Sequence, residues 1–219
     1  STLFPYTTLF RSIIDGAGSN DTAHAVRIGV GSQAAGAQAL LINAPYYNRP
    51  SQEGVYRHIM AVVEATDLPV MIYDIPGRTG VRIEDGTLAR LAEHPRVLAV
   101  KDATGDVEQG FCRMEATGLE YYSGDDGLNF AWLAHGASGM VSVVAHADAH
   151  SWRQMVTEVD AGDLAGARAV AQRMRPLVRA MMGGGQGAVM AKEALLLQGR
   201  IPSAALRLPL VRASQTEVR

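Results

Sequence analysis

The strongest constraint on the fold is an alternation that runs along most of the chain. Short apolar runs of strand type are each followed by a segment with helical spacing. The runs lie at 13–18, 39–44, 69–75, 97–100, 119–123 and 139–144. Strands that are apolar on both faces and joined by crossover helices are typical of a parallel sheet covered on both sides. The sequence therefore predicts an α/β fold with a parallel sheet.

Two parallel architectures fit this alternation, a doubly wound sheet and a (β/α)8 barrel. No G-x-G-x-x-G motif follows the first run, so a dinucleotide site is unsupported. A barrel gathers its functional groups at the C-terminal strand ends. Polar side chains follow the runs at Tyr46, Tyr47, Tyr73, Arg78, Lys101, Asp125 and Ser142. We therefore favour a (β/α)8 TIM barrel that lacks its first two strands.

The chain also divides into three parts by its composition and periodicity. Residues 1–12 have neither charge pattern nor periodicity, and we interpret them as a foreign or artefactual segment. Residues 13–150 carry the partial barrel, strands 3–8 of the full set. Residues 151–219 form a C-terminal helical region, with helices expected near 151–159, 164–182 and 188–197.

Composition excludes several classes of function. The net charge is -2 and no basic block occurs, which argues against nucleic acid as a partner. No apolar run is long enough to span a membrane. The single cysteine, Cys112, excludes an internal disulfide and a cysteine-rich metal site. The six histidines show no metal-ligand spacing. We expect a cytoplasmic protein without a metal.

Lys101 ends the apolar run at 97–100. Burial at a strand end disfavours an ammonium ion and leaves an amine that can attack a carbonyl. A structural lysine whose head reaches water is an equal alternative on this stretch alone. Tyr73, at the preceding strand end, offers a phenol that can move protons to and from an amine. Arg78 offers a planar guanidinium group, which can bind a carboxylate through two parallel hydrogen bonds. Together they favour a Schiff-base site.

The motifs at these strand ends resemble those of the dihydrodipicolinate synthase (4-hydroxy-tetrahydrodipicolinate synthase) family. The likeness extends from about Ile13 to Leu210. It is carried by Y-Y-N-R-P-S-Q-E-G at 46–54, Y-D-I-P-G-R-T-G at 73–80, V-K-D-A-T-G at 100–105 and S-G-D-D at 123–126. The resemblance implies a (β/α)8 barrel with a C-terminal helical region, usually a homotetramer of two tight dimers.

The resemblance also implies an activity. Enzymes of this family condense pyruvate with aspartate 4-semialdehyde in lysine biosynthesis by a class I aldolase-type reaction, without a cofactor. Lys101 would form the Schiff base, Tyr73 would relay protons, and Tyr47 would be lent across the tight dimer. Arg78 would guide the carboxylate of the semialdehyde. Gly124 and Val141 would complete the substrate site, Val141 through its backbone carbonyl.

Two departures from the family pattern concern regulation and the proton relay. Asn20 and Tyr46 match positions of the family's lysine inhibitor site, but His24 replaces an acidic residue often found there. The Gly-Thr-Thr-Gly-Glu motif, whose threonine links the two tyrosines, is absent from this sequence. We therefore expect the chain alone to be inactive or poorly soluble, because a barrel without two strands has open sheet edges.

Other functions remain open at this point. N-acetylneuraminate lyase and the 2-keto-3-deoxy sugar acid aldolases would share Lys101 and Tyr73. Arg78 and the stretch at 46–50 favour the synthase, because sugar acid enzymes usually lack that arginine. A non-catalytic barrel fragment is the alternative of a different class.

Overall fold

The computed structural model describes residues 12–217. The segment interpreted as foreign lies outside the described residues except for Ser12. Two compact units divide between Tyr122 and Ser123. The boundary expected near residue 150 stays a prediction.

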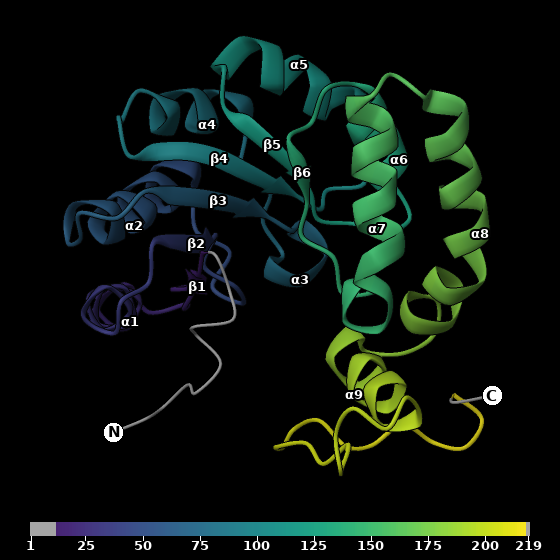
Figure 1. The fold of residues 1–219 in the computed structure, drawn as a ribbon. Coiled ribbons are helices and arrows are strands. Elements are labelled where there is room, and N and C mark those ends of the chain that lie inside the picture. The colour runs from purple at the N-terminus through teal and green to yellow at the C-terminus, as the bar shows by residue number, and fades with distance from the viewer. Residues whose placement is uncertain (1–11, 218–219) are drawn as a thin grey trace. The chain divides into compact units, whose positions relative to one another are not determined.

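The first unit is built on parallel strands that pair in sequence order (Figure 1). Its strands are β1 (Ile14–Gly16), β2 (Ala39–Asn43), β3 (Val70–Asp74), β4 (Val97–Asp102) and β5 (Glu120–Ser123), the last ending at the unit boundary. Its helices are α1 (Thr22–Ala34), α2 (Gln52–Glu64), α3 (Pro76–Thr79), α4 (Asp85–Ala92) and α5 (Val107–Thr117). The parallel α/β arrangement that the alternation predicts is confirmed here.

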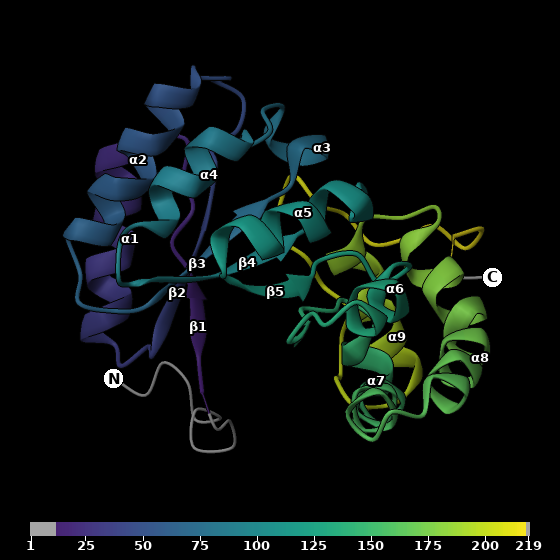
Figure 2. The same cartoon turned by 90° about the horizontal axis from the view of Figure 1, so that it is seen from above.

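Helices cover one face of this sheet. Figure 2 shows α1, α2, α4 and α5 side by side along it. Helix α2 buries Val55, Ile59, Val62 and Val63, the helical spacing expected of an amphipathic segment. Its first turn is capped by Ser51, whose hydroxyl accepts from the Gly54 amide. Buried strand residues such as Leu40 complete the core.

The second unit is mainly helical. It contains α6 (Asn129–Ala134), β6 (Gly139–Met140), α7 (Ala145–Asp160), α8 (Leu164–Met182) and α9 (Gly187–Leu197). Its core includes Trp152 and Met155 of α7, Val170 and Met174 of α8, and Met190 of α9. Among the described residues, the helices are all too short or too polar to cross a membrane.

Two predicted boundaries are wrong in this unit. The apolar run at 139–144 forms a strand only as far as Met140. The residues after Met140 are instead bound by the buried Asp126 carboxylate. It accepts hydrogen bonds from the amides of Val143 and Val144 and from the Ser142 hydroxyl. Helix α7 begins at Ala145 rather than Ser151, with a non-helical kink at Asp148 that separates an extra first turn from the predicted helix.

We predict that Asp126→Ala lowers the free energy of unfolding by about 3 kcal/mol, because the buried or part-buried donors of Ser142, Val143 and Val144 lose their acceptor at once. Urea unfolding followed by circular dichroism measures the loss. Asp125→Ala is the matched control, since the Asp125 side chain accepts only from the nearby Gly127 amide among the hydrogen bonds of the described residues. Equal stability of the two variants would contradict the role given to Asp126.

Candidate active site

Tyr73 and Lys101 lie next to each other at the ends of β3 and β4. The parallel register pairs the two residues directly. The Lys101 Nζ lies 3.8 Å from the centroid of the Tyr73 ring. Both residues are partly buried, so the amine and the phenol share one environment. The pairing predicted from sequence is thus present in the structure.

The Tyr73 phenol is held in its protonated form. Burial raises the pKa of Tyr73, and the nearby positive charge of Arg78 opposes that shift. A protonated phenol beside an amine can donate a proton to a departing hydroxide.

Arg78 is exposed on the short helix α3, directly after β3. Pro76 starts this helix with its fixed backbone angle, and Gly80 ends it in the left-handed region with φ 78°. The Thr79 hydroxyl donates to the carbonyls of Ile75 and Val81, which closes the turn. The stretch from Pro76 to Gly80 is thus a helical turn that follows the end of β3 and carries Arg78.

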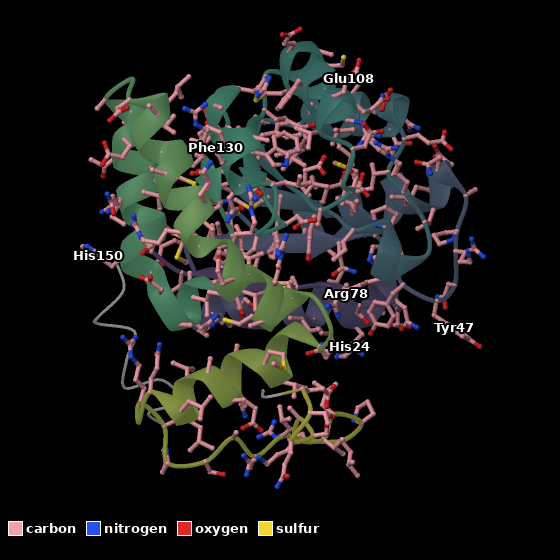
Figure 3. The ribbon with its side chains drawn as sticks, turned by 90° about the vertical axis from the view of Figure 1, so that its right-hand side faces the viewer. His24, Tyr47, Arg78, Glu108, Phe130 and His150 are labelled. Atoms are coloured by element: carbon pink, nitrogen blue, oxygen red, sulfur yellow. The ribbon has the colours of Figure 1, made fainter. Side chains whose placement is uncertain are left out.

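Tyr47 is 86% exposed, and its side chain points away from the ribbon (Figure 3). Its backbone has φ 71°, a left-handed conformation that is uncommon for a tyrosine. The chain is held there because the Tyr47 amide donates to the Thr79 carbonyl at 3.3 Å and Arg49 donates to the Gly80 carbonyl at 3.0 Å.

Asn48 forms hydrogen bonds to both Asn20 and Tyr46. The Asn48 side chain donates to the Asn20 carbonyl at 2.8 Å, and the Asn48 amide donates to the Tyr46 carbonyl at 2.8 Å. Nearby, His24 lies 3.3 Å from the Ser19 hydroxyl. Asn48 therefore links the backbones of Asn20 and Tyr46, the two residues that the family resemblance assigns to an inhibitor site.

Two buried carboxylates follow the site residues in sequence. Asp74 comes after Tyr73 and Asp102 after Lys101, and strand alternation turns them to the opposite side of the sheet. Burial raises the pKa of Asp74 to about 6 and also raises that of Asp102. Arg113 of α5 is ion-paired with Asp74 at 3.1 Å.

The model of the dihydrodipicolinate synthetase family matches residues 12–219. The chain belongs to the dihydrodipicolinate synthetase family. A 4-hydroxy-tetrahydrodipicolinate synthase from Bifidobacterium longum (strain DJO10A) is 48% identical over 206 residues, covering 94% of this chain and 68% of the relative. A synthase from Kineococcus radiotolerans is also 48% identical, with 67% of its length covered.

Solved structures of dihydrodipicolinate synthases share the fold. The enzyme from Thermotoga maritima has a TM-score of 0.89 and 35% identity, over 94% of this chain and 72% of the solved one. The enzyme from Acinetobacter baumannii, solved as a complex with pyruvate, has a TM-score of 0.90 and 34% identity, over 96% and 72%. The enzyme from Cyanidioschyzon merolae, solved with lysine bound, has a TM-score of 0.89 and 36% identity, over 94% and 70%.

Gly124 and Val141 belong to the second unit. The Val141 amide donates to the Ser123 carbonyl at 2.8 Å, next to Gly124 in sequence. Asp126 fixes the residues that follow Val141, as described above. The assignment of both residues to the substrate site of this dihydrodipicolinate synthetase family member stays a prediction.

Three charged residues near the candidate site were not predicted from the sequence: Asp74, Asp102 and Arg113. Asp74 and Asp102 could have been predicted, since an acidic residue next to a strand-end functional residue faces the opposite side of the sheet. Arg113 could not, because its partners are distant in sequence. Among residues 12–217, no group of three or more His, Cys, Asp or Glu side chains is arranged to hold a metal ion.

The raised pKa of Asp74 predicts how stability changes with pH. Its ordinary value is 3.8 and its folded value about 6, so the folded state binds more protons within that window. The free energy of unfolding should therefore fall as pH rises from about 4 to about 6, by up to about 3 kcal/mol from this group. Urea unfolding at several pH values measures the decline.

Asp74→Asn should make this decline shallower, and Asp102, also buried, should account for part of what remains. Glu84→Gln is the control, because Glu84 is exposed at the start of α4 and should leave the decline as in the parent. A decline of the same size in Asp74→Asn would contradict the assignment to Asp74.

Proposed function

We propose that this chain carries the Schiff-base site of a 4-hydroxy-tetrahydrodipicolinate synthase, which condenses pyruvate with aspartate 4-semialdehyde. The observation that carries the proposal is the Lys101 amine 3.8 Å from the Tyr73 ring, at paired strand ends of a member of this family. The named relatives are synthases, which favours this reaction over that of the sugar acid aldolases.

The chemistry follows from the two side chains. The unprotonated Lys101 amine attacks the keto carbon of pyruvate, and the resulting carbinolamine loses water to give an iminium ion. Tyr73 supplies the proton that leaves with the hydroxide, since burial keeps its phenol protonated. Loss of a methyl proton gives an enamine, whose carbon attacks the aldehyde of the second substrate, and the new alkoxide takes up a proton. The amino group of the second substrate then attacks the iminium carbon and displaces Lys101, which closes the ring of the product and frees the lysine amine. The iminium nitrogen accepts the electrons, so no cofactor is required.

Arg78 is assigned to the second substrate. Its guanidinium is exposed at the end of the sheet and acts electrostatically on Tyr73. A planar guanidinium binds a carboxylate through two parallel hydrogen bonds. We therefore place the carboxylate of aspartate 4-semialdehyde at Arg78.

Borohydride reduction in the presence of pyruvate tests the nucleophile. Lys101 and Lys192 are the lysines of the chain, so intact-mass and peptide mass spectrometry can assign an adduct without ambiguity. Adduct formation is only the first half of the reaction. We therefore expect it in the parent and in Lys192→Ala, although the chain alone is expected to lack full condensation activity, and we expect none in Lys101→Ala. Arg78→Ala should retain it, and Tyr73→Phe should slow its formation by about 100-fold. An adduct that persists in Lys101→Ala would overturn the proposal.

Tyr47 is assigned to the site of a second copy. Its 86% exposure and its direction away from the ribbon support a role outside its own chain (Figure 3). The positive φ at Tyr47 is unfavourable for a tyrosine, and the neighbouring loop contacts maintain it. We propose that two copies exchange this tyrosine in a tight dimer, and that two such dimers form a homotetramer.

Mixing two inactive variants tests the exchange. In a mixed dimer of Lys101→Ala and Tyr47→Phe chains, one site receives an intact lysine from one chain and an intact tyrosine from the other. The rate of adduct formation per intact lysine should therefore rise on mixing. The control mixes Lys101→Ala with Tyr73→Phe. Lys101 and Tyr73 of any one site belong to the same chain, so mixing these two variants creates no site in which both residues are intact. No gain in the first mixture would contradict the exchange.

The remaining assignments complete the proposal. We propose that the whole enzyme is a (β/α)8 barrel in the cytoplasm and that this chain supplies strands 3–8. From the family resemblance we assign Gly124 and Val141 to the pyruvate site, and Asn20 and Tyr46 to the binding of an inhibitory lysine. The hydrogen bonds from Asn48 to both Asn20 and Tyr46 support a common surface for these two residues.

A further inference from the structure

Arg113 contacts one segment of the chain through all three of its guanidinium nitrogens. The side chain comes from α5 and is only 5% exposed. Its Nη1 donates to Asp74 at 3.1 Å, its Nη2 to the Ile83 carbonyl at 2.9 Å, and its Nε to Asp85 at 2.6 Å. Each acceptor is thus held by a different nitrogen of a single planar group.

The three acceptors lie on either side of Arg78 in sequence. Asp74 ends β3, before α3, whereas Ile83 and Asp85 follow α3 and lead into α4. The Ile83 amide also donates to the Asp74 carboxylate at 3.3 Å. The segment from Asp74 to Asp85 is therefore a loop closed at its base by Arg113, with Arg78 at its exposed end.

The geometry of this closure requires an arginine. A guanidinium offers donors in a fixed plane, whereas a lysine ammonium is a single point on a flexible stem. A lysine at position 113 has its three N–H donors on one nitrogen and cannot span acceptors that the arginine meets with three separate nitrogens. Removal of the cation would leave the buried Asp74 carboxylate without its ion pair, which is costly in a desolvated position.

We propose that Arg113 is a positioning residue for the second substrate: it closes the loop from Asp74 to Asp85 and so holds Arg78 where its guanidinium binds a carboxylate. Arg113 is buried and does not itself bind the substrate. The inference rests on the proposed role of Arg78. It assigns to a residue of α5 a part in substrate recognition that is separate from the formation of the Schiff base at Lys101.

The test uses succinate as a carboxylate probe that cannot condense. The chain is first incubated with pyruvate, and the imine at Lys101 is reduced with borohydride to a stable adduct. The Kd of succinate for this adduct is then measured by isothermal titration calorimetry. We expect Arg113→Lys to weaken succinate binding by about tenfold, through misplacement of Arg78. The rate of pyruvate adduct formation at Lys101 should stay within about twofold of the parent. A general loss of structure would lower both.

A double-mutant cycle shows whether Arg113 acts through Arg78. In an Arg78→Ala background, Arg113→Lys should produce no further loss of succinate binding, because the side chain that it positions is gone. Arg90→Lys is the matched control, since Arg90 forms a half-exposed ion pair with Glu53 on the neighbouring α4 and α2 and should bind succinate as the parent does.

Asp85→Asn provides a second, milder variant. Asp85 is 59% exposed, so the substitution weakens one of the three contacts without removing a buried group. It should weaken succinate binding by about threefold. Parental succinate affinity in both Arg113→Lys and Asp85→Asn would overturn the inference. Failure of the parent adduct to bind succinate would overturn the role of Arg78 and this inference with it, whereas failure to form the adduct would overturn the proposed function itself.

Discussion

The parallel pairing of β3 with β4 is the interaction on which the site depends. Its register sets Tyr73 opposite Lys101, and the ring and the amine then meet at 3.8 Å. A shift of one residue would turn each side chain to the other face of the sheet. The same pairing brings the Ala103 amide to the Asp74 carbonyl, at 2.9 Å, so the hydrogen bonding continues just beyond Tyr73 and Lys101.

The two faces of these strand ends carry different chemistry. One face presents the amine and the phenol, and the other buries Asp74 and Asp102. Arg113 neutralises part of that negative charge and anchors the loop that carries Arg78. Asp74 directly follows Tyr73, and Asp102 directly follows Lys101. A change in the charge of either carboxylate can therefore shift the backbone that positions its neighbour on the other face.

Most of the first unit could be predicted from sequence, because its determinants are local. Apolar runs such as 69–75 and 97–100 define strands, and Ser51 marks the start of α2. Lys101, Tyr73 and Arg78 were found because strand ends converge in a parallel sheet. The outward direction of the exposed Tyr47 side chain was not predictable from the residues alone, since loop hydrogen bonds set it.

Elsewhere the decisive contacts are distant in sequence. The strand at 139–144 ended early because Asp126 binds the amides of Val143 and Val144, 17 and 18 positions away. Arg113 meets Asp74 across 39 positions and Asp85 across 28. Local propensity carries no information about such pairs, so tertiary structure is needed to reveal them.

The loop that carries Tyr47 has a consequence for assembly. Hydrogen bonds from Asn48 and Arg49 already fix its backbone within the chain. In the proposed dimer, a second copy that receives Tyr47 would meet a backbone that is already ordered, so association would not include the entropy cost of ordering it. Differences in affinity between related complexes lie mostly in the dissociation rate, so this ordering would act mainly on the lifetime of the dimer.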